Sequence, residues 1–206
     1  MQVIKSRRIT KLDVDNNNIS GTPLAQLMGV VPVKKLSIVH SKLYDEQVTP
    51  IKSNLLSTRN LKFLYMSHNQ MTDRALGMLG EGLAANIGIE EVQFTHNDLS
   101  LPNGAVFIAA LKNMTNLKKL SLNSCNLEIE RLQQLHEALI DKEKLVDLSL
   151  YSNDINAEGA KILAQTLANK TNLKTLGLSN NIIGQDTREG YMLSNLCNSI
   201  HVKSIT

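Results

Sequence analysis

The sequence repeats an eleven-residue pattern at a nearly constant interval, and this repetition constrains the fold more than any other feature. The pattern L-x-x-L-x-L-x-x-N-x-L begins at residues 9, 33, 61, 89, 117, 145 and 173, so one interval of 24 residues is followed by five of 28. Two of the copies read LKFLYMSHNQM and IEEVQFTHNDL. A fixed period of this length indicates a solenoid, in which each repeat buries its core only against its neighbours.

Each repeat divides into a strand and a helix. Positions four and six of the unit are apolar and two residues apart, which places both on one face of a short strand, while positions three, five and seven point to the other face. Further along the repeat, apolar residues such as Leu163 and Leu167 recur at helical spacing. Two helix columns are therefore expected in the core: Ile51, Leu79, Phe107, Leu135 and Leu163, and Leu55, Leu83, Leu111, Leu139 and Leu167.

Position nine of the unit is a polar column between the strand and the helix. Such a column can satisfy backbone groups where the chain turns inward after the strand. Its members are Asn17, Ser41, Asn69, Asn97, Cys125, Asn153 and Asn181. We expect Ser41 and Cys125 to supply a weaker version of the asparagine's hydrogen bonds.

The unit and its period resemble the leucine-rich repeats of the ribonuclease-inhibitor type, and the resemblance covers residues 9–200. It implies an α/β horseshoe of about seven to eight repeats, with a parallel sheet on the concave face and helices on the convex face. We predict one domain over residues 1–206, with residues 1–8 as an N-terminal cap and a partial repeat from residue 202. The resemblance says little about function, because one fold hosts many functions.

The composition is that of a single soluble domain, with 42% hydrophobic and 20% charged residues. No run of about 18 apolar residues is present to span a bilayer, and the segment MQVIKSRRITKL lacks the apolar stretch of a signal peptide. We therefore predict a cytoplasmic protein with no membrane partner. A bacterial effector delivered to a host cytosol and a fragment of a larger eukaryotic protein both fit this pattern.

Charge argues against a nucleic-acid partner. The net charge is only +3, and Glu90, Glu91 and Asp147 interrupt the slots that hold lysines in other repeats. No continuous basic stripe is left to follow a phosphate backbone.

Aromatic residues at outward-facing strand positions predict the binding surface. The chain has three phenylalanines, four tyrosines and no tryptophan, and Phe63, Tyr65 and Tyr151 all fall at such positions. Aromatic residues are enriched in binding hot spots, although single exposed aromatics are also common. Because Phe63 and Tyr65 share one strand face beside Val39, we predict a protein-binding patch centred on them, with Tyr151 as a second anchor. Its polar rim would comprise Lys35, His40, His68, Glu91, Gln93 and His96.

Three of those rim residues are histidines on successive repeats. Position eight reads Asn16, His40, His68, His96, Ser124, Ser152 and Asn180. Neighbouring strands lie about 4.8 Å apart and zinc lies about 2 Å from each imidazole nitrogen, so two neighbours could share an ion but three in line would be strained. A slot that also accepts Asn and Ser is typical of a generic polar position, and we expect neither a metal nor a cofactor.

Catalytic motifs are not apparent, because the sequence shows no phosphate-binding glycine loop and no triad motif. We therefore predict a non-catalytic scaffold, inhibitor or effector module that binds a protein. The alternative is a regulator of an enzyme, such as a GTPase-activating protein. Activators of the Ran-specific type have similar repeats and act through an arginine beside the sheet edge, but none of the candidate arginines matches such a slot: Arg59, Arg74, Arg131 and Arg188.

Overall fold

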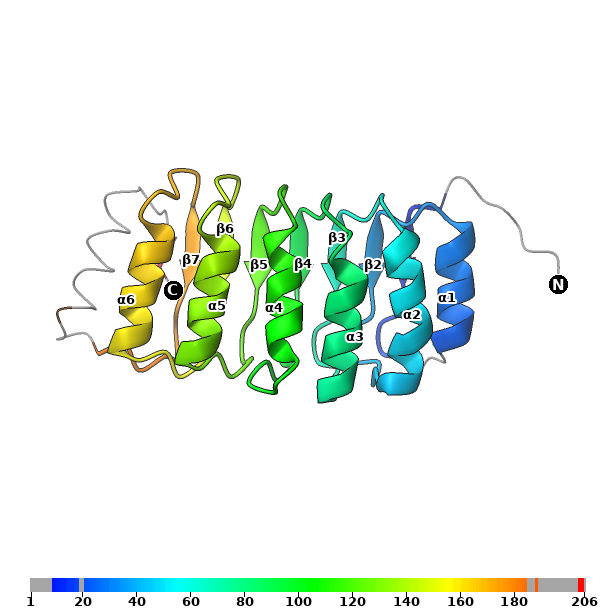
Figure 1. Ribbon diagram of the computed structural model, residues 1–206, viewed down its shortest axis with the longest axis horizontal. Coiled ribbons are helices and arrows are strands. Elements are labelled where there is room, and N and C mark those ends of the chain that lie inside the picture. The colour runs from blue at the N-terminus through cyan, green and yellow to red at the C-terminus, as the bar shows by residue number, and fades with distance from the viewer. Residues whose placement is uncertain (1–8, 19–20, 185–187, 189–203, 206) are drawn as a thin grey trace.

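The computed structural model describes residues 9–18, 21–184, 188 and 204–205. Within these residues, short strands and helices alternate along the chain (Figure 1). The strands are β1 (Lys11–Asp13), β2 (Lys35–Ser37), β3 (Phe63–Tyr65), β4 (Glu91–Gln93), β5 (Lys119–Ser121), β6 (Asp147–Ser149), β7 (Thr175–Gly177) and β8 (Ser204–Ile205). The helices are α1 (Gly21–Val30), α2 (Asp45–Ser57), α3 (Asp73–Leu83), α4 (Gly104–Lys112), α5 (Ile129–Leu139) and α6 (Ala157–Leu167). The predicted cap at residues 1–8 lies outside the described residues.

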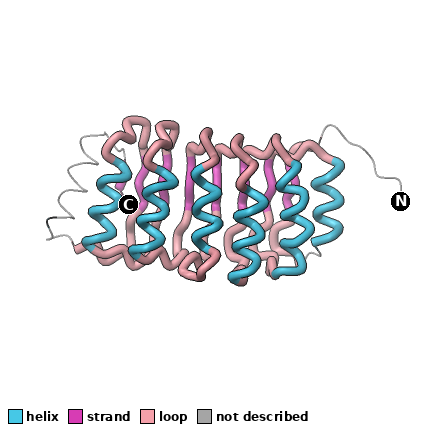
Figure 2. The backbone as a smooth tube through the Cα atoms, viewed as in Figure 1, coloured by secondary structure: helices cyan, strands magenta, loops and turns pink. Residues whose placement is uncertain are grey.

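All of these strands form one parallel sheet in chain order, β1 to β8. The register pairs equivalent repeat positions, so Lys35 lies opposite Phe63, and Phe63 lies opposite Glu91. The helices stand side by side on one face of the sheet (Figures 1 and 2). This arrangement confirms the predicted solenoid of one strand and one helix per repeat, and it leaves the opposite, concave face of the sheet uncovered by helices. No helix in the described part of the chain is long and apolar enough to cross a membrane.

The core lies between the sheet and the helix layer. Leu64 and Met66, at positions four and six of one repeat, are fully buried. Both predicted helix columns are also buried, with Leu111 0% and Leu135 1% exposed. Because one hydrophobic cluster runs continuously from Leu24 to Leu178, each repeat is stabilised by contact with its neighbours.

The polar column at position nine forms a ladder of hydrogen bonds, as predicted. The amide of Asn69 donates to the carbonyl oxygens of Ile38 at 2.6 Å and Met66 at 2.9 Å, and its oxygen accepts from the backbone N–H of Ser41 at 2.9 Å. Cys125 takes the same place in its own repeat, with its sulfur 3.4 Å from the carbonyl oxygen of Phe94. Burial raises the pKa of this thiol to about 12, so Cys125 is a structural residue and not a nucleophile.

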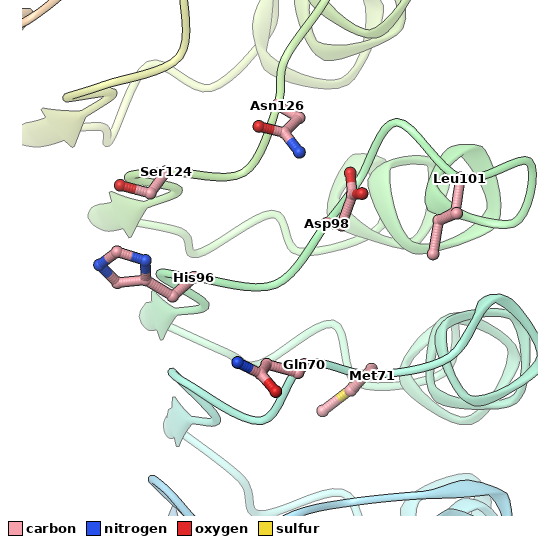
Figure 3. A pocket seen from close by; sticks show the side chains of 7 residues that line it. All are labelled: Gln70, Met71, His96, Asp98, Leu101, Ser124 and Asn126. Atoms are coloured by element: carbon pink, nitrogen blue, oxygen red, sulfur yellow. The ribbon is translucent and has the colours of Figure 1, made fainter.

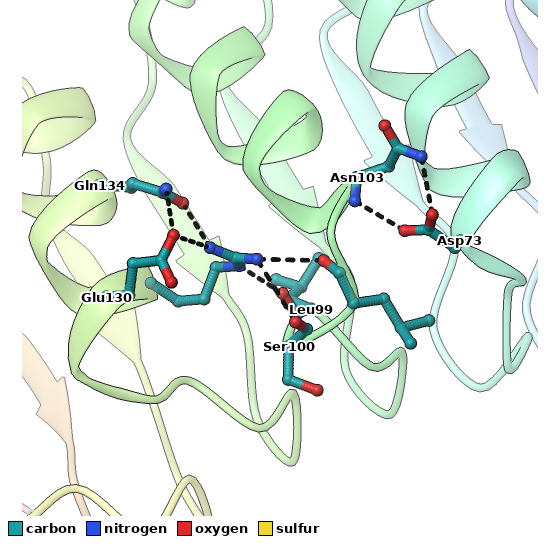
Figure 4. A network of polar contacts seen from close by, with 8 residues as sticks. Asp73, Leu99, Ser100, Asn103, Glu130 and Gln134 are labelled. Atoms are coloured by element: carbon teal, nitrogen blue, oxygen red, sulfur yellow. Dashed lines mark hydrogen bonds and ion pairs between the residues drawn. The ribbon is translucent and has the colours of Figure 1, made fainter.

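Buried cations join neighbouring repeats at the ends of the helices. Arg131 on α5 is only 6% exposed, and its guanidinium donates to the carbonyl oxygens of Leu99, Ser100 and Leu101 (Figure 4). Lys142 and Lys170, 28 residues apart, each donate from Nζ to a carbonyl oxygen at the end of the preceding repeat's helix, on Lys112 and Ile140. A cation is favourable at a helix C-terminus, which is where Lys142 and Lys170 donate. Arg131 instead satisfies carbonyl oxygens of the loop that precedes α4.

The same side of the solenoid carries a carboxylate-mediated contact. Asp73 at the start of α3 accepts hydrogen bonds from the backbone N–H and the side-chain amide of Asn103, at 2.6 and 2.8 Å (Figure 4). Asp73, Arg131, Lys142 and Lys170 thus hold neighbouring repeats together on the helix side.

A candidate binding surface on the concave sheet

The structure places all of the predicted site residues on the concave face of the sheet or at its edge. Residues at position three form one row across the strands, and residues at positions five, seven and eight form successive rows beside it. The pairing of β2, β3 and β4 brings together Lys35, Phe63, Tyr65, Glu91 and Gln93. Val39, His40, His68 and His96 follow these strands, whereas Tyr151 follows β6, further along the solenoid.

Tyr65 is the centre of a polar cluster. Its hydroxyl donates to Oε1 of Glu91 at 2.9 Å, and Nε2 of Gln93 donates to the same oxygen at 2.9 Å. The ammonium of Lys35 lies 4.1 Å from the centroid of the Tyr65 ring, in a cation–π contact. Burial, then the hydrogen bond from Tyr65 to Glu91 and the charge of Glu91, raise the pKa of Tyr65 to about 12. The tyrosine therefore stays protonated and is held in one orientation.

Phe63 lies next to this cluster on the same strand. It is partly buried and stands in the same row as Lys35 and Glu91. Lys35 covers one face of the Tyr65 ring. Phe63 is the purely apolar side chain of this group. We call Lys35, Phe63, Tyr65, Glu91 and Gln93 the Tyr65 cluster.

The three histidines form a stack along the edge of the concave face. The ring centroids of His40 and His68 are 4.1 Å apart with an interplanar angle of 13°, and those of His68 and His96 are 4.3 Å apart with an angle of 29°. Burial, then the charges of His96 and His40, lower the pKa of His68. Stacked rings face each other and do not converge on one point, and no group of three or more metal-ligating side chains is found in the described residues.

Backbone geometry explains which residues occupy the histidine column. His40, His68 and His96 have φ angles of 51°, 59° and 57°, and every other member of position eight is also in the left-handed region: Asn16, Ser124, Ser152 and Asn180. Asn and His are several-fold enriched in this region among non-glycine residues. The column is thus selected first by a turn that needs positive φ, a requirement that the residue types alone did not reveal.

Two depressions indent this side of the molecule. One, of about 350 Å³, lies beyond the histidine stack and is lined by Gln70, Met71, His96, Asp98, Leu101, Ser124 and Asn126 (Figure 3). The carboxylate of Asp98 there is engaged by the backbone and hydroxyl of Ser100, at 3.0 and 2.7 Å. The other, of about 300 Å³, lies over β4 to β6 on the concave face and is lined by Glu91, Gln93, Lys119, Ser121, Asp147, Ser149 and Tyr151, among others. Sequence reasoning missed this second hollow, although the small residues at position five were a usable signal.

Three of the described arginines, Arg59, Arg74 and Arg131, stand away from the concave face. Arg59 lies in the turn after α2 and donates to the carbonyl oxygens of Leu56 and Thr58. Arg74 is exposed on α3, and Arg131 is buried on α5. None of these three lies beside the carboxyl edge of the sheet, where the GTPase-activator alternative would require an arginine.

Comparison with known proteins bears on the fold. A family model described as Leucine Rich repeat matches residues 58–80. Among solved structures, an internalin from Listeria monocytogenes matches with 19% identity and a TM-score of 0.47, over 97% of this chain and 61% of the internalin chain. This chain therefore spans less than two thirds of that protein's length. No curated protein matches. The ribonuclease-inhibitor subtype stays a prediction, but the repeated unit, the parallel sheet with one strand per repeat and the family match identify the chain as a leucine-rich-repeat protein.

Proposed function

We propose that this chain is a non-catalytic protein-binding module whose partner lies on the concave face, against the Tyr65 cluster. Leucine-rich-repeat folds are common protein–protein interaction modules. The observation that carries the proposal is the order of the Tyr65 cluster: Lys35, Glu91 and Gln93 fix the tyrosine by two hydrogen bonds and a cation–π contact on a face that takes no part in the core.

Such an arrangement suits binding because it lowers the entropic cost of association. Ordering one flexible side chain at an interface costs about 0.5–1.5 kcal/mol, and this cost is smaller where the side chain is already fixed in the free protein. Phe63 would supply the apolar anchor, Val39 would extend it, and His40, His68 and His96 would lie at the rim. Tyr151 would provide a second contact further along the sheet.

The rival reading, a GTPase activator, needs an arginine that can reach a bound nucleotide. Arg59, Arg74 and Arg131 are on the helix side or its turns, and the placement of these three supports simple binding. A turnover assay with purified small GTPases is expected to show no acceleration. A cytoplasmic setting, including delivery into a host cell, stays a prediction from the sequence.

Histidine footprinting tests the proposal with an internal control. A partner is first selected from a displayed library of protein domains, and the complex is then treated with diethyl pyrocarbonate, which modifies accessible imidazoles. His40 and His96 are exposed at the concave edge, whereas His136 lies on α5, with Nδ1 3.0 Å from the hydroxyl of Thr166. The partner should slow modification of His40 and His96 and leave His136 unchanged. Protection of His136 alone would overturn the concave-face assignment.

A further inference from the structure

The hollow over β4 to β6 has the size and lining of a site for one side chain. Its volume of about 300 Å³ is at the lower end of ligand pockets, which span roughly 300–1,000 Å³. Its floor lies at Ser121 on β5, between Gln93 on one neighbouring strand and Ser149 and Tyr151 on the other side. Small residues at position five leave this space open, whereas Tyr65 and Gln93 fill the same row on β3 and β4.

The floor of the hollow presents oriented hydroxyl groups. Ser149 donates its hydroxyl proton to Oδ1 of Asn123 at 2.8 Å, and the amide of Asn123 donates to the hydroxyl of Ser121 at 3.1 Å. Because Ser149 uses its only proton on Asn123, its oxygen is left as an acceptor. A donor-rich ligand group is therefore favoured over one that only accepts hydrogen bonds.

The wall beyond the floor is aromatic. The ring of Tyr151 lies against Gly177 on β7 so closely that a Cβ at that glycine would be 2.6 Å from Cζ of the tyrosine. Gly177 thus makes room for the ring. A flat cation could stack on the exposed part of this ring.

Two carboxylates and one ammonium set the charge of the rim. Glu91, Lys119 and Asp147 occupy position three on successive strands, and Lys119 makes no ion pair with either acid within 4.0 Å. Among the described residues, no hydrogen bond or ion pair engages the partly buried carboxylate of Asp147. Burial raises the pKa of Asp147, the charge of Lys119 lowers it and the charge of Glu91 raises it, and the net change is upward. Glu91, Lys119 and Asp147 together carry a formal charge of −1, and in the described part of the chain no cation lies within 4.0 Å of the Asp147 carboxylate.

We propose that this hollow receives an arginine side chain of the protein partner, with Asp147 as its main counter-ion. The proposal rests on the proposed function, because it places part of the same partner on the concave face. A guanidinium carries five N–H donors in a plane, pairs with carboxylates in a bidentate way and stacks on aromatic rings, so it matches Asp147, the Ser149 oxygen and the Tyr151 ring together. An apolar side chain would instead bury Asp147 without a partner, which is unfavourable.

The probe for this site is N-acetyl-arginine amide, titrated into isotope-labelled protein while backbone amide resonances are followed by NMR. At about −0.3 kcal/mol per non-hydrogen atom, a probe of this size binds with a Kd on the order of 1 mM. We expect saturable shifts at Ser121, Ser149 and Tyr151, and much weaker ones with N-acetyl-citrulline amide, which has nearly the same shape without the charge.

Substitutions test whether Asp147 itself, and not the overall negative charge of the protein, binds the arginine. Asp147→Asn should weaken arginine binding about tenfold, because it removes a charge-assisted hydrogen bond. Glu137→Gln also neutralises one carboxylate, at an exposed position on α5, and should leave arginine binding unchanged. Lys119→Gln should strengthen binding, since it removes the repelling ammonium.

Three results would overturn the proposal: no saturable shift at the hollow, equal binding of the citrulline probe, or full binding by Asp147→Asn. The proposed function fails by a different result. If a selected partner binds more weakly to Phe63→Ala but equally well to Asp147→Asn, concave-face binding stands and the arginine site is wrong. If the arginine probe binds as expected but partners footprint on the helix side, the proposed function fails and the site remains.

Discussion

Replacing Cys125 with asparagine should stabilise the protein, because it completes the ladder at position nine. At two neighbouring rungs an asparagine oxygen accepts the backbone N–H of the preceding column member: Asn153 from Cys125 at 2.9 Å, and Asn181 from Asn153 at 3.0 Å. The backbone N–H of Asn97 meets the Cys125 sulfur instead, which is a weaker acceptor than an amide oxygen. The thiol also makes weak contacts to the carbonyl oxygens of Phe94 at 3.4 Å and Asn123 at 3.3 Å.

The size of the effect follows from the bonds gained. The new side chain would replace a weak sulfur acceptor with an amide oxygen at the Asn97 N–H, and a weak sulfur donor with an amide N–H at the Phe94 carbonyl oxygen. One or two net hydrogen bonds at about 0.5–1.5 kcal/mol each correspond to about 1–2 kcal/mol in the free energy of unfolding. For a chain of this size, that raises the melting temperature by about 2–8 °C.

Chemical denaturation of the wild type, Cys125→Asn and Cys125→Ala measures the change in the free energy of unfolding. The alanine variant is the matched control, since it removes the sulfur contact without adding an acceptor, and it should be less stable than the wild type. The reasoning would be refuted if Cys125→Asn unfolds at the same or a lower denaturant concentration than the wild type. That result would mean that the buried slot does not admit an amide in the ladder geometry.

Three further predictions concern packing and titration. Leu111→Ala and Leu135→Ala should each cost about 2–5 kcal/mol in denaturant melts, because both leucines are buried, and a loss below about 1 kcal/mol for both would contradict the core assignment. Gly104→Ala should cost about 1–3 kcal/mol, because its Cβ would lie 2.1 Å from the Leu99 carbonyl oxygen, whereas Gly88→Ala should be nearly neutral, since its nearest neighbour would be 3.6 Å away. The pKa of Tyr65 near 12, above its ordinary value of 10.0, means that its contribution to stability is complete below pH 10 and is lost as the pH rises toward 12. Absorbance titration of tyrosinate should show this late ionisation move to lower pH in Glu91→Gln, and an unchanged titration would contradict the role of Glu91.

The histidine stack predicts a loss of stability at low pH, whereas Tyr65 predicts a loss at high pH. The pKa of His68 is lowered, so its contribution to stability is present above its ordinary value of 6.5 and is lost as the pH falls through the folded-state pKa. NMR titration should place the pKa of His68 below that value and raise it when His40 and His96 are both changed to Asn, which tolerates their backbone geometry. No change in the double variant would show that the neighbouring charges have no effect.

Periodicity determined most of the fold. The apolar positions of each unit predicted the strand face, the helix columns and the strand register, because every repeat must bury the same surface against the next one. Leu111 and Leu135 are buried as expected, and Asn69 bonds to the backbone as expected. These features are predictable because they are repeated, so one misread residue does not alter the pattern.

Individual side chains were less predictable, because their roles depend on neighbours 28 residues away. The buried ammonium of Lys170 looks like an ordinary surface charge until the carbonyl oxygen of Ile140 is placed beside it. Likewise, Tyr65 was predicted as an outward-facing anchor, and only the structure shows Lys35 over its ring and Glu91 at its hydroxyl. Pairings of this kind are set by rotamers, which a sequence pattern does not encode.

The most direct test of concave-face binding compares the affinities of two variants, Phe63→Ala and Leu56→Ala, for one protein partner. Phe63 lies on β3 of the sheet, whereas Leu56 is 44% exposed on α2 of the helix side and serves as the matched control. With a selected protein partner, calorimetry should show that Phe63→Ala weakens binding by about 2 kcal/mol or more, roughly thirtyfold, while Leu56→Ala changes it by less than about 0.5 kcal/mol. A larger loss for Leu56→Ala than for Phe63→Ala would contradict the account.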